Sequence, residues 1–244
     1  MNIHEIAKVE TCYVEKFGTP RQSGVVSSAW GRIVFSEEYQ NVDYIRGLEG
    51  FSHLWLVFVF HESIKSDVAE VGVKATVRPP RLGGNEKVGV FASRSPFRPN
   101  PIGLSLARIE KIEQTKDKGS VIHISGVDLV SDTPLLDVKP YIPYCDSVGG
   151  EVSDNVCAGY VQGAPEKMAV MWEKGIDEDL NDDFKKLIEE TLAVDPRPAY
   201  HDDEREYGCL VEGINVRWKV KAGGGDDYSG KMSKVVKILS CAQA

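Results

Sequence analysis

The chain has 244 residues, of which 42% are hydrophobic and 27% are charged, and its formal net charge is −8. This size fits one large domain or two unequal domains, and this composition excludes a mostly disordered, collagenous or coiled-coil protein. No apolar run reaches about 18 residues, so we expect no membrane span. The N-terminus has neither the basic lead nor the apolar core of a signal peptide, so we expect no export.

The first 145 residues are rich in short strands. β-branched and aromatic residues gather in short segments that Gly, Pro, Asn and Asp separate. The expected strands cover residues 6–14, 31–35, 53–60, 69–77, 88–91, 104–112 and 121–127. Many strands with few long helices predict a barrel or a sandwich.

Two segments in this part stand out. Residues 53–60 are apolar at almost every position, so we expect a central strand that is covered on both faces. Val42, Ile45 and Leu48 recur every three residues before a glycine, which predicts a short helix over residues 39–48.

The composition changes after residue 141. Residues 145–163 are rich in Gly, Ser, Asp and Asn, and they indicate a boundary. Residues 177–194 then form the clearest predicted helix, because Ile176, Leu180, Phe184, Leu187, Ile188 and Leu192 share one helical face. Residues 207–220 and 231–239 read as two closing strands joined by a flexible connection over 223–230. We therefore predict a first domain over residues 1–145, a linker over 146–165 and a small α/β domain over 166–244.

Charge is distributed unevenly along the chain. Residues 74–108 hold seven basic side chains and one acidic side chain, which gives a local charge of +6 in an otherwise acidic protein. The seven are Lys74, Arg78, Arg81, Lys87, Arg94, Arg98 and Arg108. Such a concentration is typical of an anion-binding segment, although a solvated basic face is the simpler alternative.

The most informative segment is residues 93–105, Ser-Arg-Ser-Pro-Phe-Arg-Pro-Asn-Pro-Ile-Gly-Leu-Ser. Three prolines in six positions remove three backbone donors and restrict the residues before them, so this segment predicts a stiff irregular loop. It holds Arg94, Arg98 and Asn100 in fixed directions, which suits a preshaped ligand cradle. The alternative is a rigid turn whose arginines cap nearby carbonyl groups.

Four other segments carry polar side chains on loops. Residues 78–85 place two arginines around a Pro-Pro step, residues 17–22 hold an arginine and an amide, and residues 128–141 read as a loop with three carboxylates. Residues 195–200, Asp-Pro-Arg-Pro-Ala-Tyr, could stack on bases or close the small domain. Each of these compositions also suits an ordinary turn.

His61 and Glu62 follow directly on the apolar strand, where a polar pair is well placed to line the mouth of a pocket. A structural role for His61 is the alternative. His53 and His123 lie inside strand patterns and read as structural. The five cysteines are far apart and form no C-x-x-C pair, so we expect neither a disulfide framework nor a metal site, and a reducing cytoplasm fits best.

Taken together, five segments resemble the TrmO family, also called TsaA-like or YaeB-like, of S-adenosylmethionine-dependent tRNA methyltransferases. They are residues 16–22, 47–55, 78–84, 93–103 and 195–200, in this order, and the resemblance runs from about residue 3 to residue 218. The string Arg-Ser-Pro-Phe-Arg-Pro-Asn-Pro-Ile-Gly is its most specific part. The chain departs from the family at Ser131-Asp132-Thr133-Pro134, where the family usually reads Asp-Gly-Thr-Pro.

The resemblance implies a mainly β fold, a single-sheeted antiparallel β-barrel with a small α/β C-terminal domain. It implies a homodimer that uses S-adenosyl-L-methionine for the N6-methylation of threonylcarbamoyl-adenosine, beside the anticodon of threonine tRNA. It also assigns the methyl donor to a set of contact residues. These are Pro20, Arg21, Gln22, His61, Glu62, Arg94, Leu104, Asp128, Leu129, Val130 and Ser131.

The chemistry suits these residue types. A sulfonium methyl group needs no metal, so transfer depends mainly on placement, and we expect Arg94, Arg98 and Asn100 to provide it. We hypothesise that Arg94 or Arg98 clamps the carboxylate of the modified nucleoside. No general base is evident; Glu62 and Asp128 are candidates, and solvent is the alternative.

Two other readings remain open at this stage. The same barrel could be a non-catalytic module that binds an adenosine ligand or RNA. A hydrolase is disfavoured, because the sequence offers no nucleophile paired with a base. We expect the +6 segment and residues 195–200 to contact the anticodon loop, so binding should weaken as salt rises.

Overall fold

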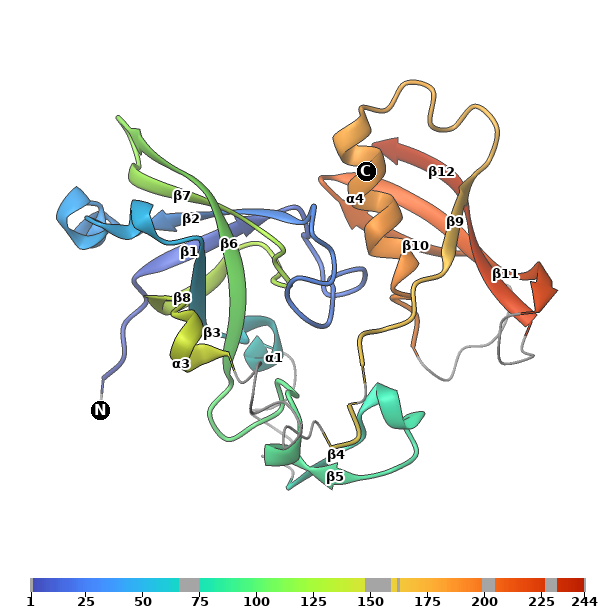
Figure 1. Ribbon diagram of the computed structural model, residues 1–244, viewed down its shortest axis with the longest axis horizontal. Helices are drawn as coiled ribbons and strands as arrows, with labels where there is room; N and C mark the ends of the chain where they lie inside the picture. Colours follow the sequence, from blue (N-terminus) through green and yellow to red (C-terminus); the bar gives the residue numbers. More distant parts are fainter. Residues whose placement is uncertain are drawn as a thin grey trace.

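A computed structural model describes residues 2–65, 75–147, 159–161, 163–198, 205–226 and 232–243. Its first unit is a closed antiparallel barrel with the strand order β1-β2-β7-β6-β3-β8 (Figure 1). The strands are β1 (Ala7–Thr11), β2 (Trp30–Phe35), β3 (His53–Val59), β6 (Ile102–Thr115), β7 (Gly119–Ser125) and β8 (Thr133–Pro140). This closed single sheet confirms the predicted mainly β fold class.

Alternation along the strands builds the barrel core. In β3, Leu54, Leu56 and Phe58 are buried inside the barrel, with at most 4% of their surface exposed. The residues between them, Trp55, Val57 and Val59, face outward and stay partly exposed. The prediction that this strand is covered on both faces is therefore wrong for the single chain, because only the barrel interior covers it.

Two further predictions for this unit are corrected. Residues 39–48 form no α-helix; the 3₁₀ turns η1 (Glu37–Tyr39), η2 (Val42–Tyr44) and η3 (Leu48–Gly50) cover this stretch. Gly47 separates η2 from η3 with a φ of 89°, which a continuous helix does not allow. Residues 133–140, read as a loop, form β8, since Thr133 and Leu135 alternate into the core.

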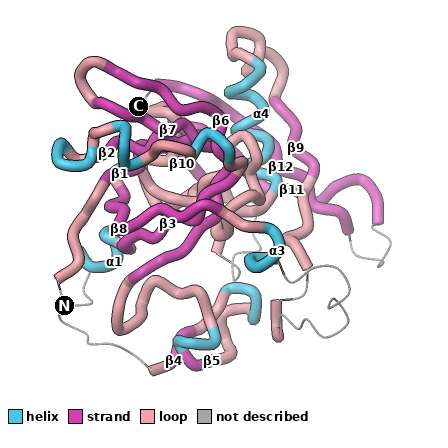
Figure 2. Tube along the Cα trace, turned by 60° about the vertical axis from the view of Figure 1, so that its left-hand side comes forward, coloured by secondary structure: helices cyan, strands magenta, loops and turns pink. Residues whose placement is uncertain are grey.

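Short elements surround the barrel. They are α1 (His61–Lys65), β4 (Thr76–Val77), η4 (Pro80–Leu82), β5 (Val88–Gly89), η5 (Val90–Ala92) and α3 (Pro143–Asp146). β4 and β5 pair as a separate two-stranded ribbon at the bottom of Figure 2. Residues 69–74 of one predicted strand, and much of the predicted linker, lie outside the described residues.

The C-terminal unit is a sheet with the strand order β10-β11-β12-β9, packed against one helix. Its elements are β9 (Ala169–Trp172), α4 (Asp182–Ala193), β10 (Tyr207–Val211), β11 (Ile214–Asp226) and β12 (Met232–Gln243). The Asn181 side chain caps α4 by accepting from Phe184 N at 2.8 Å, so the helix begins later than predicted. The segment predicted as one strand over 207–220 is two strands, because the chain turns at Glu212 and Gly213 with positive φ.

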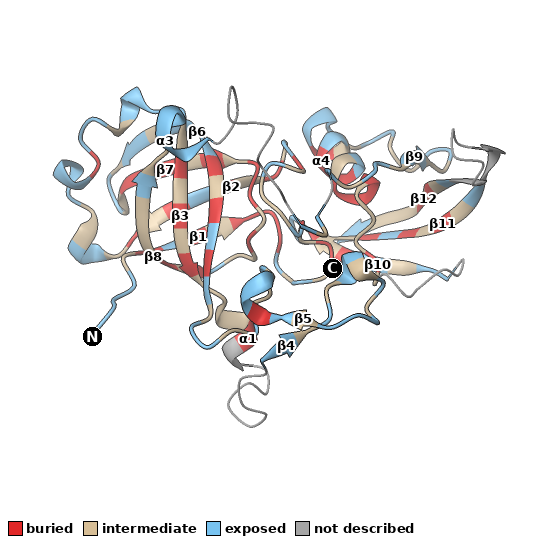
Figure 3. Ribbon diagram, turned by 60° about the horizontal axis from the view of Figure 1, so that its bottom comes forward, coloured by how far each residue is buried: buried red, intermediate tan, exposed pale blue. Residues whose placement is uncertain are grey.

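The barrel and the C-terminal unit share one continuous core. Buried residues extend from the barrel into the loop between β1 and β2 and on to the inner side of α4 (Figure 3). Tyr13 forms an isolated bridge with Val211 across this seam. Within the described part of the chain, no helix has the length and apolar character needed to cross a membrane.

Candidate functional site

The proline-rich loop is braced by its own polar groups. Arg98 Nη1 donates to the carbonyl oxygens of Ser93 at 2.9 Å and Ser95 at 3.3 Å, while Ser93 Oγ donates to the Val90 carbonyl at 2.8 Å. Arg98 thus caps carbonyl groups, as the alternative reading of this loop expected. A guanidinium has five N–H donors, so these bonds from Nη1 leave the side chain able to bind a ligand as well.

Arg94 reaches across to the loop between β1 and β2. Its Nη1 donates to Gln22 Oε1 at 2.5 Å, which joins two segments that are 72 residues apart in the sequence. Arg94 is exposed to solvent and Gln22 is half-buried. The structure therefore brings together two residues that the sequence placed in separate motifs.

Asp128 lies beside this pair. It accepts a hydrogen bond from Ser105 Oγ at 2.6 Å. Burial raises the pKa of the Asp128 carboxyl above its ordinary value, although hydrogen bonds from Ser105 and the backbone of Ser23, and the charge of Arg94, act in the opposite direction. We call Gln22, Ser23, Arg94, Ser105 and Asp128 the Arg94 cluster.

The residues that follow Asp128 are fixed by backbone contacts. The carbonyl of Leu129 accepts from Thr11 Oγ1 at 2.8 Å, and that of Val130 accepts from Thr133 Oγ1 at 2.5 Å. Ser131 N donates to the Tyr13 carbonyl at 2.7 Å. The segment 128–131 is thus attached to the start of the loop that carries Pro20, Arg21 and Gln22.

Asp132 follows with a φ of 64°, in the left-handed region. Glycine adopts this region without a steric cost, and aspartate is among the few other residues that tolerate it. The aspartate thus takes the backbone conformation expected of the glycine in the family pattern.

His61 and Glu62 begin α1 at the end of β3. His61 Nε2 lies 3.4 Å from Glu62 Oε1, and Lys16 Nζ donates to the Glu62 carbonyl at 2.9 Å. The pair is therefore attached to the loop that carries Gln22.

The remaining predicted residues take different environments. Leu104 is 57% exposed on the outer face of β6, whereas its neighbour Ser105 points inward. Asn100 is exposed, and its carbonyl accepts from Ile102 N at 2.7 Å. Pro20 is buried, and the exposed Arg21 donates from Nη2 to the Arg197 carbonyl at 2.9 Å.

Arg197 itself closes the small domain. Its side chain is 3% exposed, forms two bonds to the Asp195 carboxylate at 2.7 and 2.8 Å, and lies over the Tyr207 ring at 5.9 Å. The Arg197 guanidinium already bonds to Asp195 within the protein, so the structure favours closure of the small domain over stacking on bases as the role of Arg197. Tyr200, from the same predicted loop, lies outside the described residues.

The basic segment is a surface feature. Arg78, Arg81 and Lys87 are exposed on and around the β4–β5 ribbon, and Arg81 Nη1 donates to the Gly163 carbonyl at 3.0 Å. Lys74 lies outside the described residues. These exposed cations suit contacts with phosphate groups.

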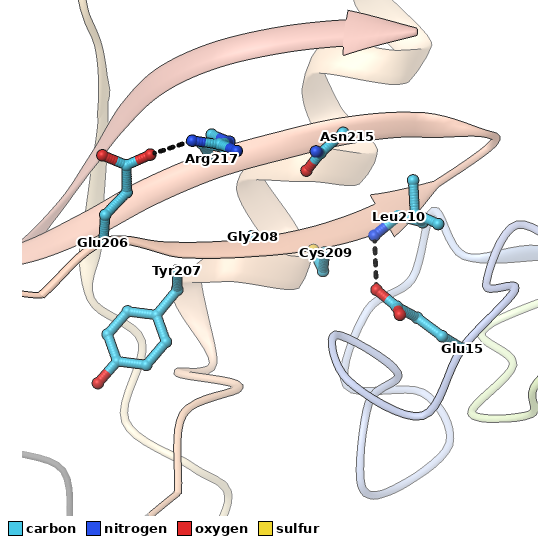
Figure 4. A pocket seen from close by; sticks show the side chains of 8 residues that line it. All are labelled: Glu15, Glu206, Tyr207, Gly208, Cys209, Leu210, Asn215 and Arg217. Atoms are coloured by element: carbon cyan, nitrogen blue, oxygen red, sulfur yellow. Dashed lines mark hydrogen bonds and ion pairs between the residues drawn. The ribbon is translucent and has the colours of Figure 1, made fainter. Parts of the chain in front are cut away.

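A surface hollow of about 650 Å³ lies elsewhere, on the C-terminal sheet (Figure 4). Glu15, Glu206, Tyr207, Gly208, Cys209, Leu210, Asn215 and Arg217 line it. Two of its lining residues, Glu206 and Arg217, form an ion pair at 3.0 Å. None of these residues belongs to the Arg94 cluster. In the part of the chain that the structure describes, no group of three His, Cys, Asp or Glu is placed to hold a metal ion.

Comparisons with known proteins identify the family. Residues 8–147 match the tRNA-methyltransferase O N-terminal domain, and residues 165–226 match the TrmO C-terminal domain. The chain belongs to the TrmO family. The resemblance seen in the sequence is therefore confirmed.

Relatives and solved structures extend this finding. The tRNA (adenine(37)-N6)-methyltransferase of Escherichia coli is 42% identical over 230 residues, which cover 90% of this chain and 93% of that protein. The protein of the same name in Mus musculus is 44% identical over 144 residues, 58% of this chain and 31% of that one. The crystal structure of TrmO from Pseudomonas aeruginosa matches with a TM-score of 0.72 and 29% identity, covering 99% of this chain and 98% of that one.

Proposed function

We propose that this TrmO-family chain methylates N6 of threonylcarbamoyl-adenosine, next to the anticodon of threonine tRNA, with S-adenosyl-L-methionine as the methyl donor. The observation that carries the proposal is the Arg94 cluster, which joins the proline-rich loop to the loop of Gln22 at 2.5 Å. The match to both TrmO domain families and the name of the Escherichia coli relative support it.

The residues present fit this donor. S-adenosyl-L-methionine carries a sulfonium, an ammonium, a carboxylate and ribose hydroxyls, and when bound it supplies an activated methyl group. The partly buried Asp128 carboxylate suits positive groups, whereas the Arg94 guanidinium suits a carboxylate. Pro20, Arg21, Gln22, His61, Glu62, Arg94, Leu104 and residues 128–131 would hold the donor.

The role of the protein in the transfer is placement. The methyl group needs no further activation, so the rate depends on holding the acceptor nitrogen in line at attack distance. Arg98 and Asn100 lie on the same stiff loop as Arg94, and they would hold the modified nucleoside. We assign the carboxylate of threonylcarbamoyl to Arg98, because a guanidinium binds a carboxylate through two parallel hydrogen bonds.

One proton must leave the acceptor nitrogen. Glu62 and Asp128 are the carboxylates among the proposed site residues that could accept this proton. Burial raises the pKa of Asp128, which brings this carboxyl closer to the range in which a base works at neutral pH. We therefore favour Asp128 over Glu62 for this role, with water as the alternative acceptor.

Mass spectrometry of tRNA nucleosides tests the proposal. Unmethylated tRNA that contains threonylcarbamoyl-adenosine should gain one methyl group on this nucleoside when it is incubated with the protein and S-adenosyl-L-methionine. The same incubation with tritiated donor separates the enzyme from the alternative, a module that binds an adenosine ligand or RNA. Such a module would bind donor or RNA and transfer no label.

We also propose that the protein acts as a homodimer in the cytoplasm. The outer face of β3 and β6 is apolar, since Val57 pairs with Leu104 and Val59 pairs with Ile102. Ile102 is 39% and Leu104 is 57% exposed in the single chain. A second copy would cover this face beside the proposed donor contact Leu104. Light scattering after gel filtration should give a dimer for the wild type and a monomer for Val57→Glu.

A further inference from the structure

The loop over residues 12–29 joins β1 to β2 and carries Pro20, Arg21 and Gln22. One side of it lies on the barrel, where Gly24 N donates to the Gly126 carbonyl at 2.8 Å and Leu106 N donates to Ser23 Oγ at 3.3 Å. Its other side reaches toward α4 and β10, between the two units (Figure 1). The contacts on this second side belong to the C-terminal domain.

The start of the loop is bound to α4 and β10. Tyr13 Oη and Thr191 Oγ1 share a hydrogen bond of 2.9 Å, and these residues are 0% and 1% exposed. Glu212 N donates to the Cys12 carbonyl at 2.9 Å. Glu15 accepts from Leu210 N at 2.9 Å (Figure 4). These hydrogen bonds, of which the one between Tyr13 and Thr191 is buried, fix the direction in which the loop leaves β1.

The middle of the loop packs on aromatic rings. Phe17 stacks on Trp218 with ring centres 5.8 Å apart and on Tyr207 at 6.3 Å. Gly18 has a φ of 91°, and a Cβ atom there would lie 3.0 Å from Cys209, so a larger residue would strain this close approach to β10. The next contact along the chain is the bond from Arg21 to the Arg197 carbonyl.

The end of the loop is held by one carboxylate of α4. Glu190 accepts from Ser27 Oγ at 3.0 Å, from Ser28 N at 2.9 Å and from Ser28 Oγ at 2.8 Å. Burial acts to raise the pKa of Glu190, but the hydrogen bonds from Ser28 and Ser27 outweigh it and hold the pKa below its ordinary value. The ionised carboxylate therefore makes charge-assisted bonds, which are stronger than neutral ones.

We propose that the C-terminal domain holds loop 12–29 in its donor-binding shape, and that Glu190 is a positioning residue for the methyl donor. The inference rests on the proposed function, because it takes Pro20–Gln22 as donor contacts. A loop that is released from α4 samples more conformations. The affinity for the donor then falls in proportion to the fraction of molecules whose loop keeps the donor-binding shape. The small domain thus completes the donor site of the barrel.

Calorimetric binding of S-adenosylhomocysteine to the full chain tests this. We expect Glu190→Ala to weaken binding about tenfold, since several charge-assisted bonds to the loop are lost. Glu190→Gln keeps an acceptor and the side-chain volume, and it should restore part of the affinity. Affinity for tRNA, measured without donor, should change less than twofold in both variants.

Glu189→Ala is the matched control. Glu189 is the neighbour of Glu190 on α4, but it accepts from Trp172 Nε1 at 2.7 Å within the C-terminal domain. Its loss disturbs the same helix without touching the loop, so binding of S-adenosylhomocysteine should stay at the wild-type level. Hydrogen exchange in peptides from loop 12–29 should speed up in Glu190→Ala and not in Glu189→Ala.

If Glu190→Ala does not fold, the double variant Ser27→Ala/Ser28→Ala removes the hydroxyl donors from the loop side and takes its place. Wild-type affinity and wild-type loop exchange in these variants would overturn the inference while the methyltransferase assignment stands. Absence of S-adenosylhomocysteine binding by the wild type would overturn both. Equal losses in the Glu189 and Glu190 variants would assign Glu190 to domain stability alone.

Discussion

Arg21 donates a hydrogen bond of 2.9 Å to the backbone carbonyl of Arg197, 176 residues further along the chain. Arg21 lies on a loop of the barrel, and Arg197 closes the C-terminal domain through its two bonds to Asp195. Because these bonds to Asp195 restrain Arg197, the backbone carbonyl of Arg197 is held at a fixed place. One bond thus connects the proposed donor loop to a rigid turn of the other domain.

Arg98→Lys should impair methylation of the acceptor without weakening binding of the donor. Lysine keeps the positive charge, but it cannot form the two parallel bonds to a carboxylate. We expect methylation of the modified nucleoside to fall about tenfold or more, because misplacement of the acceptor is costly. Affinity for the donor should remain nearly intact, as measured by calorimetry.

Arg108→Lys is the control for this prediction, since Arg108 lies in the same basic segment but pairs with Glu110 on β6. It should methylate at the wild-type rate. Equal loss of methylation and donor affinity in Arg98→Lys would contradict the acceptor role and assign Arg98 to bracing of the loop.

Asp128→Asn should stabilise the protein at neutral pH. Burial raises the pKa of this carboxyl, so the folded state binds its proton more tightly than the unfolded state. Between the unfolded and the folded pKa, stability therefore falls as pH rises, and the penalty is complete above the folded pKa. Asparagine carries no such penalty, and its amide oxygen can still accept from Ser105.

Urea unfolding at several pH values measures this effect. The variant should exceed the wild type at pH 7, and the difference should disappear below the ordinary pKa of aspartate. The same variant should bind the donor more weakly, because a carboxylate is lost from the proposed site. A variant that is less stable than the wild type at pH 7 would contradict the argument.

The sequence predicts those parts of the fold that depend on local patterns. Alternation of apolar residues predicts most barrel strands, and the three prolines of residues 93–105 predict an irregular loop. β8 was missed because Pro134, Asp137 and Pro140 resemble loop composition, although Thr133 and Leu135 are buried by neighbouring strands. Burial of this kind arises only when the barrel closes, so no local pattern shows it.

The sequence predicts which residues belong to the site but not how they contact one another. The motifs indicate Gln22, Arg94 and Asp128, but the bond between Gln22 and Arg94 joins distant segments and is set by the barrel. The sequence does not indicate a role for Glu190, because an acidic residue on the polar side of an amphipathic helix is usually solvated. Its partners, Ser27 and Ser28, lie on the other domain, so only the packed structure reveals its role.

Gly103→Ala should destabilise the barrel. A Cβ atom at this position would lie 2.2 Å from the Phe58 ring, a contact that the packed interior cannot absorb without movement. We expect a loss of about 1–3 kcal/mol, and the additional change Phe58→Leu should restore part of it. Gly89→Ala is the control, since no atom lies within 4 Å of its added Cβ. Thermal unfolding that shows no loss for Gly103→Ala would contradict the close approach.

Substitutions at Asp132 test whether this residue takes the left-handed conformation at the position where the family pattern has glycine. Its φ of 64° costs a β-branched residue about 1–2 kcal/mol, whereas glycine adopts it freely. We expect Asp132→Val to lose about that much stability, and Asp132→Gly to equal or exceed the wild type by up to about 1 kcal/mol. Chemical unfolding at constant pH gives the order. A valine variant as stable as the glycine variant would contradict the left-handed conformation.

Binding to tRNA should depend on salt through the exposed cations of the β4–β5 ribbon. Each phosphate contact with a single-stranded loop contributes about −0.7 to the slope of log K against log salt. Arg78→Ala should therefore weaken binding to all tRNA substrates similarly and reduce the magnitude of the slope by about 0.7, measured by filter binding over a range of salt concentrations. Lys237→Ala is the control, because Lys237 pairs with Glu173 at 2.7 Å on the C-terminal sheet. An unchanged slope in Arg78→Ala, or an equal change in both variants, would place the phosphate contacts on another face of the protein.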